Sequence, residues 1–357
     1  MGKVSFDERM MRRCFFLAEK GLGFVAPNPL VGCVITLGEE IVSEGYHAAF
    51  GEAHAERAAI ANVPVEMMGK MREATLYVNL EPCAHFGKTP PCAPLIAEMG
   101  FKRVVISNRD PYKEVNGRGI EILKAAGIEV TEGVLEEQGR RLNRRFFTMQ
   151  EKGRPYVILK WAKSADDFIG ILDSKGKAKR TRLSNDISKL MVHRMRAYES
   201  AILIGTQTAV IDNPLLTVRL CKGQNPVRLL IDKDLIVNET SNIFSNDAKT
   251  IVYTEAASEE KEWGERVHVD YDDKGGVSIP QIFEDLAKRG LSSVIVEGGS
   301  ATLQSFIDQG YWDEARVETA SEIVLTRGIQ APVLKNNEVF RQDNFEGHTI
   351  EWHRHIE

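Results

Sequence analysis

The stretches "HAE" at residues 54–56 and "PCAHFGKTPPC" at residues 82–92 decide the fold and the chemistry of the first half of this chain. They supply His54 and two cysteines, Cys83 and Cys92, which are separated by eight residues and each follow a proline. Zn²⁺ prefers such nitrogen and sulfur donors, and a catalytic zinc keeps three protein ligands and one open position for water. Glu56, two residues after the histidine, can move a proton between that water and a leaving group. The pattern therefore predicts a hydrolytic zinc site.

The expected local structure favours catalysis over two simpler interpretations. A His-x-Glu alone is common by chance, and two cysteines alone can be small buried hydrophobic residues. A structural zinc module that mediates assembly would need four ligands, with His85 as the fourth. However, His54 is expected to open a helix, Cys83 to follow a strand, and Cys92 to open another helix. A helix N-terminus stabilises a thiolate, so this placement suits a metal ligand.

Composition narrows the class of protein. With 357 residues the chain is too long for one typical core, so two domains are expected. The net charge of −5 comes without a block of like charge, and a nucleic-acid surface would need a basic face, so we expect no nucleic-acid partner. The N-terminus has neither a signal-like apolar core nor the roughly 20 apolar residues of a membrane span, which predicts a cytoplasmic protein without a membrane partner. The five cysteines are too few and too uneven in number for a disulfide framework.

The first half alternates between helical and strand patterns. Helical spacing predicts helices at 7–21, 53–63, 92–100, 117–127 and 135–152. Runs of β-branched and aromatic residues predict a hairpin at 31–47 and strands at 74–80, 103–108 and 128–134. The last helix ends at Gly-Arg-Pro 153–155, which places a domain boundary near 147–155 and domains at 1–150 and 151–357.

The second half alternates in the same way. Strands are expected at 156–162, 200–205, 227–232, 250–254 and 292–299, and helices at 186–197, 279–290 and 300–310. Strands that alternate with helices indicate a largely parallel sheet. Both halves are therefore expected to be of the α/β class.

The motifs of the first half resemble a known superfamily. "HAE" (54–56) followed by "EPC" (81–83) is similar to the cytidine-deaminase superfamily, whose general signature is H-x-E followed by P-C-x-x-C, although the wider cysteine spacing departs from that signature. Together, "PNPLVGCVI" (27–35), "GYHAAFGEAHAE" (45–56), "EPCAHFGKTPPC" (81–92) and "GRGIEILKAAGIEV" (117–130) resemble one branch, the bifunctional riboflavin-biosynthesis deaminase/reductases, which has the longer spacing. The resemblance implies a cytidine-deaminase-like α/β/α domain at the N-terminus.

The resemblance also implies roles for single residues of this domain. His54, Cys83 and Cys92 would bind Zn²⁺, and Glu56 would be the proton shuttle. The residues expected around the substrate are Asn28, His47, His85 and Lys88.

Glycine-rich signals in the second half are weak by themselves. "VEGGSATL" (296–303) places two glycines between a strand and a helix, where backbone amides can approach a phosphate, although a plain Gly-Gly turn explains it equally well. The stretches "SAILIGTQTAVIDNPLLTVR" (200–219) and "SSVIVEGGSATLQSFIDQGYWDE" (292–314) resemble the reductase half of the same bifunctional family. That resemblance implies a dihydrofolate-reductase-like domain that uses NADPH.

The reductase resemblance assigns two sets of residues. The NADPH contacts would be Ala162, Arg182, Thr208, Asp212, Gly299, Ser300, Ala301, Thr302, Leu303, Gln304 and Ser305. The substrate contacts would be Arg180, Arg196, Leu216, Arg219 and Glu297, and the arginine forks among them suit a sugar phosphate. Two positions depart from the family pattern: Asp167 stands where a glycine is usual, and Arg182 where a tryptophan is common.

The whole pattern predicts a bifunctional enzyme of riboflavin synthesis. The resemblance implies that the first domain hydrolyses the 2-amino group of 2,5-diamino-6-ribosylamino-4(3H)-pyrimidinone 5′-phosphate, and that the second reduces the ribosyl group of the product to ribityl. The partner is thus a small phosphorylated ribosylaminopyrimidine, and a homo-oligomer is compatible with the sequence. An alternative is a deaminase for another base, nucleoside or tRNA, with a reductase-like half kept as a scaffold.

Overall fold

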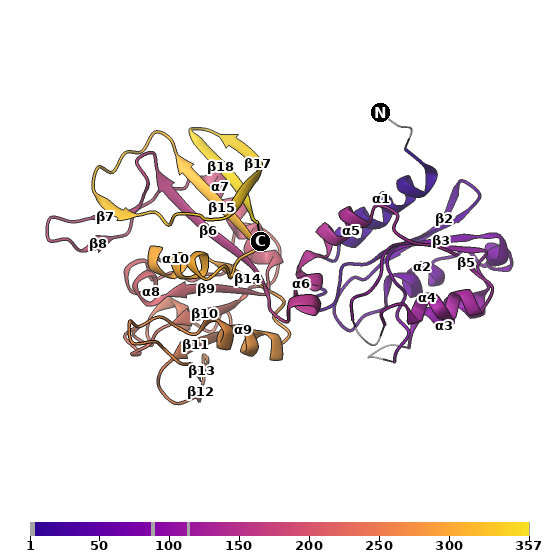
Figure 1. Cartoon of the computed structure of the whole chain (residues 1–357), viewed down its shortest axis with the longest axis horizontal. Coiled ribbons are helices and arrows are strands. Elements are labelled where there is room, and N and C mark those ends of the chain that lie inside the picture. Colours follow the sequence, from indigo (N-terminus) through magenta and orange to yellow (C-terminus); the bar gives the residue numbers. More distant parts are fainter. Residues whose placement is uncertain (1–3, 87–89, 113–114, 357) are drawn as a thin grey trace. The chain divides into compact units, whose positions relative to one another are not determined.

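The chain folds into two compact units, Met1–Gly153 and Arg154–Glu357, in a computed structural model (Figure 1). The structure describes residues 4–86, 90–112 and 115–356. None of the helices in these ranges is both long and apolar enough to cross a membrane.

Unit 1 is built around a five-stranded sheet with the order β2-β1-β3-β4-β5. Its strands are β1 (Gly32–Leu37), β2 (Glu40–Tyr46), β3 (Thr75–Leu80), β4 (Arg103–Asn108) and β5 (Glu129–Thr131). Strand β1 is antiparallel to β2 and β3, whereas β3, β4 and β5 are parallel. The helices are α1 (Phe6–Glu19), α2 (Ala55–Ala61), η1 (Val65–Glu73), α3 (Cys92–Met99), α4 (Arg118–Ala125), α5 (Glu136–Leu142) and α6 (Arg144–Lys152).

Helices cover both faces of this sheet. In β1, Cys33 and Ile35 point to one face and pack with α2, α3 and α4, while Val34 points to the other and packs with α1. This alternation follows from the two-residue period of a strand. The result is a three-layer α/β/α unit with one apolar core on each side of the sheet.

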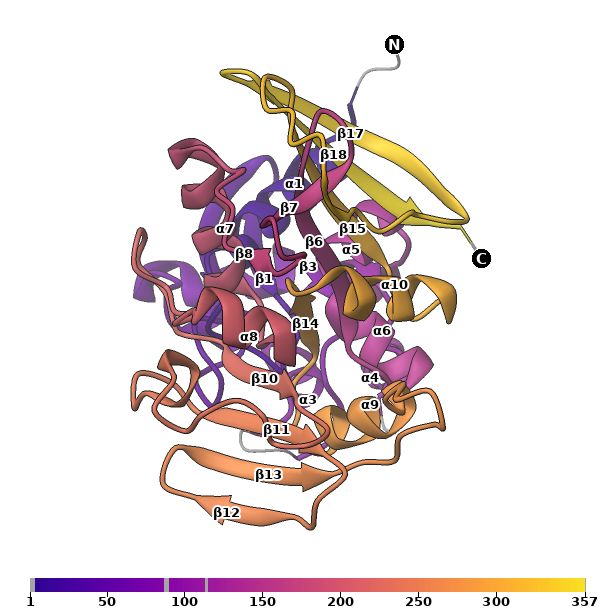
Figure 2. The same cartoon turned by 90° about the vertical axis from the view of Figure 1, so that its left-hand side faces the viewer.

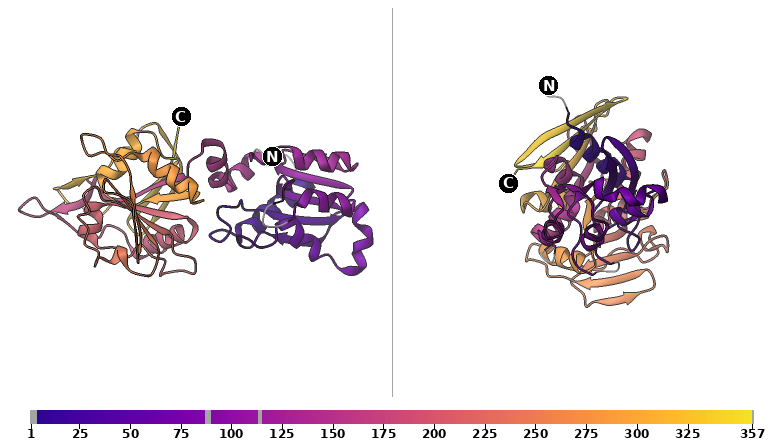
Figure 3. Two further views of the ribbon diagram at one scale, coloured as in Figure 1. Left: turned by 90° about the horizontal axis from the view of Figure 1, so that it is seen from below. Right: turned by 90° about the vertical axis from the view of Figure 1, so that its right-hand side faces the viewer.

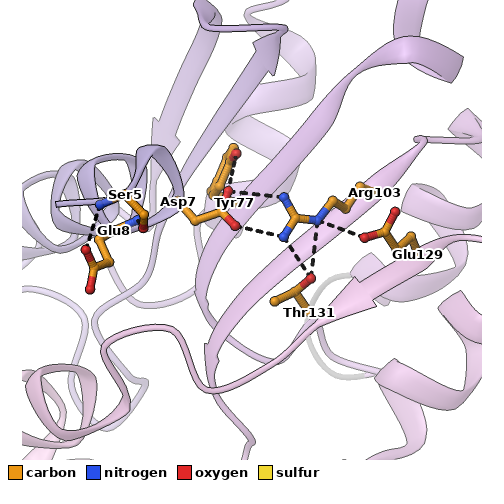
Figure 4. Close-up of polar contacts among 7 residues, drawn as sticks. All are labelled: Ser5, Asp7, Glu8, Tyr77, Arg103, Glu129 and Thr131. Atoms are coloured by element: carbon orange, nitrogen blue, oxygen red, sulfur yellow. Dashed lines mark hydrogen bonds and ion pairs between the residues drawn. The ribbon is translucent and has the colours of Figure 1, made fainter. Parts of the chain in front are cut away.

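A polar network fixes the start of α1 to the sheet (Figure 4). Ser5 caps the helix and forms a reciprocal pair with Glu8. Asp7 accepts hydrogen bonds from two donors of Arg103, at 3.1 and 2.7 Å, and from the Tyr77 hydroxyl at 2.9 Å. Burial alone would raise the pKa of Asp7, but the Arg103 and Tyr77 hydrogen bonds outweigh it and hold the pKa below its usual value.

Asp7→Asn should therefore loosen α1 in a pH-dependent way. A carboxylate whose folded-state pKa is depressed contributes stability above the unfolded-state pKa, near 4, and that stability is lost as the pH falls. At pH 7 the substitution should speed amide exchange of α1 by roughly 10- to 100-fold, the loss of about 1–3 kcal/mol for charged hydrogen bonds. Hydrogen exchange referenced to intrinsic rates measures this. The exposed Glu19→Gln at the other end of α1 is the control, and equal protection in both variants would contradict the argument.

The helix predicted over 135–152 is two helices. Asn143 lies at the break between α5 and α6, with φ −97° and ψ 22°. Its side-chain amide receives the backbone N–H of Leu30 at 2.8 Å and donates to the Leu30 carbonyl at 2.9 Å. This pairing with Leu30, which lies just before β1, interrupts the helix. The local sequence around Asn143 does not indicate it.

Unit 2 is built around a ten-stranded sheet with the order β12-β13-β11-β10-β9-β14-β6-β15-β18-β17 (Figure 2). Its strands are β6 (Tyr156–Ser164), β9 (Ala201–Gly205), β10 (Val227–Ile231), β11 (Thr250–Thr254), β12 (Glu259–Lys261), β13 (Gly264–His268), β14 (Ser293–Val296), β15 (Glu314–Ala320), β17 (Asn337–Phe345) and β18 (His348–His355). The central strands from β13 to β15 are parallel, and β12, β18 and β17 add antiparallel pairs at the edges. The largely parallel sheet expected from the sequence is confirmed.

The remaining elements of unit 2 cover the sheet or extend from it (Figure 3). A small sheet is formed by β7 (Phe168–Leu172), β8 (Ala178–Lys179) and β16 (Gly328–Gln330). Helices α9 (Ile279–Lys288) and α10 (Ser300–Asp308) pack on one face, and α7 (Asp186–Tyr198) and α8 (Thr206–Asp212) on the other. A short turn, η2 (Asn242–Phe244), completes the unit. Strands β7, β8, β12, β13 and β15–β18 and helix α8 were not predicted, since most of these segments are very short or have apolar patterns that polar residues interrupt.

Candidate active sites

The predicted zinc ligands lie together in unit 1. The ligand atoms of His54, Cys83 and Cys92 are all within 4.8 Å of one another. The Nδ1 atom of His54 is 3.5 Å from each of the two Sγ atoms, so this nitrogen faces the thiols. One nitrogen and two sulfurs around a common point are donors that suit Zn²⁺, so the residues fit the metal.

Each ligand is placed by the start or end of an element. His54 is the N-cap of α2, Cys83 follows β3, and Cys92 is the first residue of α3. The backbone N–H of Cys92 donates to the Sγ of Cys83 at 3.2 Å, which ties the two thiols together. Arg57 donates to the carbonyls of Pro90 and Pro91, at 3.1 and 3.4 Å, and so holds the segment that leads into α3.

Hydrogen bonds among the three donors shift their pKa values. A hydrogen bond from the Cys92 thiol lowers the pKa of Cys83 to about 4, and the same bond, together with burial, raises the pKa of Cys92. The hydrogen bond with Cys83 raises the pKa of His54. At neutral pH the Cys92 thiol therefore keeps its proton, which a metal must displace.

Glu56 lies in the first turn of α2 and is 3% exposed. Burial raises its pKa to about 7. A carboxyl group that changes protonation state near neutral pH, beside a metal-ligand cluster, is suited to take and give a proton.

A cavity of about 340 Å³ opens beside this cluster. Among its walls are Asn28, His47, His85, Asp110 and Tyr112, together with His54, Glu56 and Cys83. Asn28 Nδ2 is 3.1 Å from His47 Nε2, and the other ring nitrogen of His47 is 3.1 Å from the Ala53 carbonyl oxygen. Three of the four residues expected around the substrate thus line one cavity, and the fourth, Lys88, lies outside the described residues.

Two carboxylates of this region were not predicted from the sequence. Asp110 lines the cavity just after β4, and burial raises its pKa to about 7. Glu81 is buried and accepts four backbone N–H groups, from Asp110, Gly117, Gly119 and Ile120, at 3.0–3.3 Å. A Cβ at Gly119 would lie 2.0 Å from the Pro82 carbonyl oxygen, so only glycine allows this close approach. In the sequence, the signal for both carboxylates is their position directly after an apolar strand.

In unit 2, two loops meet at the carboxyl ends of neighbouring parallel strands. Gly205 ends β9, and Gly298 and Gly299 follow β14. A Cβ on Gly205 would lie 2.5 Å from Thr302 Oγ1, and one on Gly298 would lie 2.7 Å from the Ile204 Cβ. Helices α8 and α10 begin here, so their N–H groups and the hydroxyl of Thr208 lie at one sheet edge, an arrangement that suits phosphate groups.

A charged group is buried next to this edge. Arg196 donates to both carboxylate oxygens of Glu297, at 3.2 and 2.8 Å. Burial alone would raise the pKa of Glu297, but the charges of Arg196 and Lys160 outweigh it and hold the pKa at about 2. Burial also lowers the pKa of Lys160, against the attraction of Glu297. Lys160 was not predicted, although a lysine within the apolar run "YVILKWA" was a visible signal.

The other reductase residues fall into three groups. Ala162 follows Lys160 on the same face of β6, and burial raises the pKa of Asp212, which ends α8 opposite the charge of Arg180. Leu216 is buried, and Arg219 is exposed with its guanidinium 3.0 Å from Thr217 Oγ1. Gly299, Ser300, Ala301 and Thr302 lie at the start of α10.

Some side chains assigned to the cofactor are used elsewhere. Leu303 packs into the core, Ser305 donates to the Thr302 carbonyl, and Gln304 exchanges hydrogen bonds with the backbone of Val333. The backbone N–H of Leu303 is also used, since it donates to the Gly299 carbonyl at 3.1 Å. Arg182 is exposed and paired with Asp186 at 2.6 Å.

Asp167 is the other position that departs from the family pattern. Asp167 has φ 64°, in the left-handed region where glycine is normally favoured. Its carboxylate pairs with Lys163 at 2.6 Å. The position at which the family pattern places a glycine thus has, in this chain, an aspartate with a backbone conformation that suits glycine.

Comparison with known proteins agrees with this arrangement. Residues 4–108 match the family described as "Cytidine and deoxycytidylate deaminase zinc-binding region", and residues 155–339 match the "RibD C-terminal domain". The riboflavin biosynthesis protein RibD of Aquifex aeolicus is 37% identical over 89% of this chain and 88% of its own length. That of Bacillus amyloliquefaciens is 38% identical over 94% of this chain and 89% of its own.

A solved structure extends the similarity to the whole fold. A diaminohydroxyphosphoribosylaminopyrimidine deaminase/5-amino-6-(5-phosphoribosylamino)uracil reductase from Thermotoga maritima is 37% identical and superposes with a TM-score of 0.87. The match covers 98% of this chain and 99% of the other.

Fold and site together define a zinc-dependent deaminase joined to an NADPH-dependent reductase, and the predicted fold class is confirmed. The chain belongs to the RibD family, the bifunctional deaminase/reductases of riboflavin biosynthesis.

Zinc affinity should rise with pH between about 6 and 8. Because the Cys92 thiol keeps its proton near neutrality, uptake of zinc must release that proton, which corresponds to a gain in affinity of about tenfold per pH unit. Competition between zinc-stripped protein and a chromophoric chelator measures this. An affinity that is the same at pH 6 and pH 8 would show that the donors are already deprotonated.

Proposed function

We propose that unit 1 hydrolyses the 2-amino group of 2,5-diamino-6-ribosylamino-4(3H)-pyrimidinone 5′-phosphate, and that unit 2 uses NADPH to reduce the ribosyl group of the product to ribityl. The deaminase and reductase activities for which the Thermotoga maritima relative is named support this choice of substrate. The observation that carries the proposal is the convergence of His54, Cys83 and Cys92 beside the buried Glu56 at the wall of one cavity.

His54, Cys83 and Cys92 would hold the metal, which supplies an activated water at neutral pH when it is bound. Glu56 would take a proton from water on its carboxylate and give it to the leaving amino group. Its pKa of about 7 suits both halves of that transfer. A catalytic zinc needs an open fourth position for water. His85 is not part of the donor group formed by the described residues, so it does not fill that position.

The cavity beside the metal ligands would orient the substrate. His47 donates its Nδ1 proton to Ala53 and receives Asn28 Nδ2 on Nε2, so it is held as a neutral ring, and burial lowers its pKa accordingly. Asn28 then has its carbonyl oxygen left for a donor on the pyrimidine. His85 and Lys88 would bind the ribose phosphate end.

In unit 2, the loops after β9 and β14 would bind the cofactor, which supplies a hydride when it is bound. Thr208, Asp212, Ala162 and the start of α10 would contact it. Arg196, Leu216, Arg219 and Glu297 would bind the substrate, and Arg180 and Arg182 would add charge at the rim. We place the enzyme in the cytoplasm, where its small-molecule partners are.

Glu56→Gln should retain zinc but lose deamination by about 10²–10⁴-fold, because an amide cannot carry the proton. Ammonia release from the diaminopyrimidine phosphate measures this, with zinc content determined on the same protein. Glu98→Gln, an exposed carboxylate on α3, is the matched control and should behave as wild type. NADPH-dependent reduction of the already deaminated substrate should be unchanged in both. A loss of less than about tenfold would remove Glu56 from the proposal.

Arg219→Ala should weaken reduction and spare ammonia release. Loss of a charged partner typically costs about 1.5–3 kcal/mol, or roughly 10- to 100-fold in kcat/KM for the reductase substrate. NADPH oxidation measures the effect, and Lys222→Ala, exposed in the same loop, is the control. If either Glu56→Gln or Arg219→Ala abolished both activities in folded, zinc-loaded protein, the two units would not hold separate sites.

A further inference from the structure

The segment that carries Leu216 and Arg219 has an unusual backbone. Asn213 and Leu216 have φ of 42° and 55°, in the left-handed region that bulky residues rarely enter. Such conformations cost on the order of 1–3 kcal/mol each and persist only when the surroundings impose them. Leucine has no polar side chain to offset that cost locally, so contacts from elsewhere must hold the segment.

Helix α7 supplies two of those contacts. The backbone N–H of Arg219 donates to Nδ1 of His193 at 3.0 Å. One turn along the helix, Arg196 donates to the Thr217 carbonyl at 3.4 Å while its fork binds Glu297. A Cβ on Gly223 would lie 2.4 Å from the Ala197 side chain, so the chain also runs directly against the helix beyond the segment.

Contacts away from α7 hold the other parts of the segment. Val218 N–H donates to Asn225 Oδ1 at 2.8 Å, and Asn213 pairs with Asn242 through its side-chain and backbone oxygens, at 2.7 and 2.8 Å. Among the contacts to the segment's backbone, the one from His193 has a titratable acceptor.

The bond to Arg219 defines the state of the His193 ring. His193 is 7% exposed, and Nδ1 can accept an N–H only when it carries no proton, so the ring is neutral with its proton on Nε2. The charged groups that face it are Arg196 from α7, Arg219 from the segment itself, and Glu297 from the end of β14. Burial and then the two arginines lower the pKa of His193, against the opposing effect of Glu297.

We infer that His193 is a positioning residue of the reductase: its neutral ring holds the backbone of Arg219, and protonation of the ring releases the segment that binds the substrate. The sign follows from the depressed folded-state value. Above about pH 6.5, the usual pKa of histidine, the ring is neutral and the bond is fully present. As the pH falls through the folded-state pKa, which lies below that value, a proton on Nδ1 removes the acceptor, and the left-handed backbone loses a support. The consequence for catalysis rests on the proposed roles of Leu216 and Arg219.

Two substitutions at His193 separate the hydrogen bond from simple packing. His193→Leu fills the space without an acceptor, whereas His193→Asn places a carbonyl oxygen near the position of Nδ1 that does not titrate. At pH 7.5, His193→Leu should raise KM for the deaminated pyrimidine phosphate by about tenfold, the loss of one hydrogen bond, with a smaller effect on kcat. His193→Asn should recover most of that loss. Arg194→Ala, on the exposed side of α7, is the control.

The pH profile adds a readout that a packing role would not change. For the wild type, KM of the reduction should be constant above pH 6.5 and should rise only at a lower pH, where the ring takes up a proton, and for His193→Asn it should stay flat. Ammonia release by unit 1 should not follow the substitutions. If the wild type and His193→Asn gave the same acid limb, or if Leu and Asn were equally impaired, the inference would be wrong.

Amide hydrogen exchange tests the positioning without any assay of activity. The Arg219 amide of the wild type should lose protection between pH 7.5 and 5, after correction for intrinsic rates, and His193→Leu should remove about tenfold of protection at pH 7.5. If protection responds as expected while KM does not, His193 still positions the segment but the proposed substrate role of Leu216 and Arg219 fails. If protection is unchanged in His193→Leu, the positioning role itself is refuted.

Discussion

The carboxylate of Glu81 is the interaction on which the deaminase site depends. It is buried at the end of β3, two residues before Cys83, and accepts four backbone N–H groups from the loop after β4 and the start of α4. A buried carboxylate without such partners would be very costly, so the bonds and the burial require each other. Glu81 thereby joins the chain just before Cys83 to the segment that carries Asp110 at the cavity wall.

Unit 2 also buries a charged carboxylate, and there charged side chains rather than backbone N–H groups stabilise it. Glu297 stands at the end of β14 between Arg196 and Lys160, and its negative charge is balanced by theirs. The group joins a helix on one face of the sheet to two central strands. It therefore fixes α7 relative to the carboxyl edge of the sheet, and α7 in turn supports the segment with the left-handed Leu216.

In both units, helices and strands carry the functional side chains, and buried charged groups fix the positions of these elements. In unit 1 the ligands stand at one strand end and two helix starts, where backbone geometry leaves little freedom. In unit 2, glycines allow the loops after β9 and β14 to touch, and two helices start at the same edge, which is where we propose that the cofactor binds. The zinc-dependent deaminase and NADPH-dependent reductase activities of the family follow from donors and edges of these kinds.

The sequence by itself indicated the three candidate zinc donors that the fold brings together, the α/β class of both halves and most central strands and helices, because donor chemistry and hydrophobic period are local properties. The glycines after β14 were likewise visible as single residues, whereas the left-handed backbone of Asp167 was not predicted. Only the tertiary structure decided the break at Asn143, which depends on Leu30, and the role of Glu81, whose partners lie 29 to 39 residues further along the chain. It also decided that Leu303, Gln304 and Ser305 turn their side chains into the fold, and that His193 supports Arg219. Such contacts join residues far apart in sequence or depend on which way a helix faces. The hydrophobic period of a short segment does not indicate these partners, because only the packing of the whole unit brings them together.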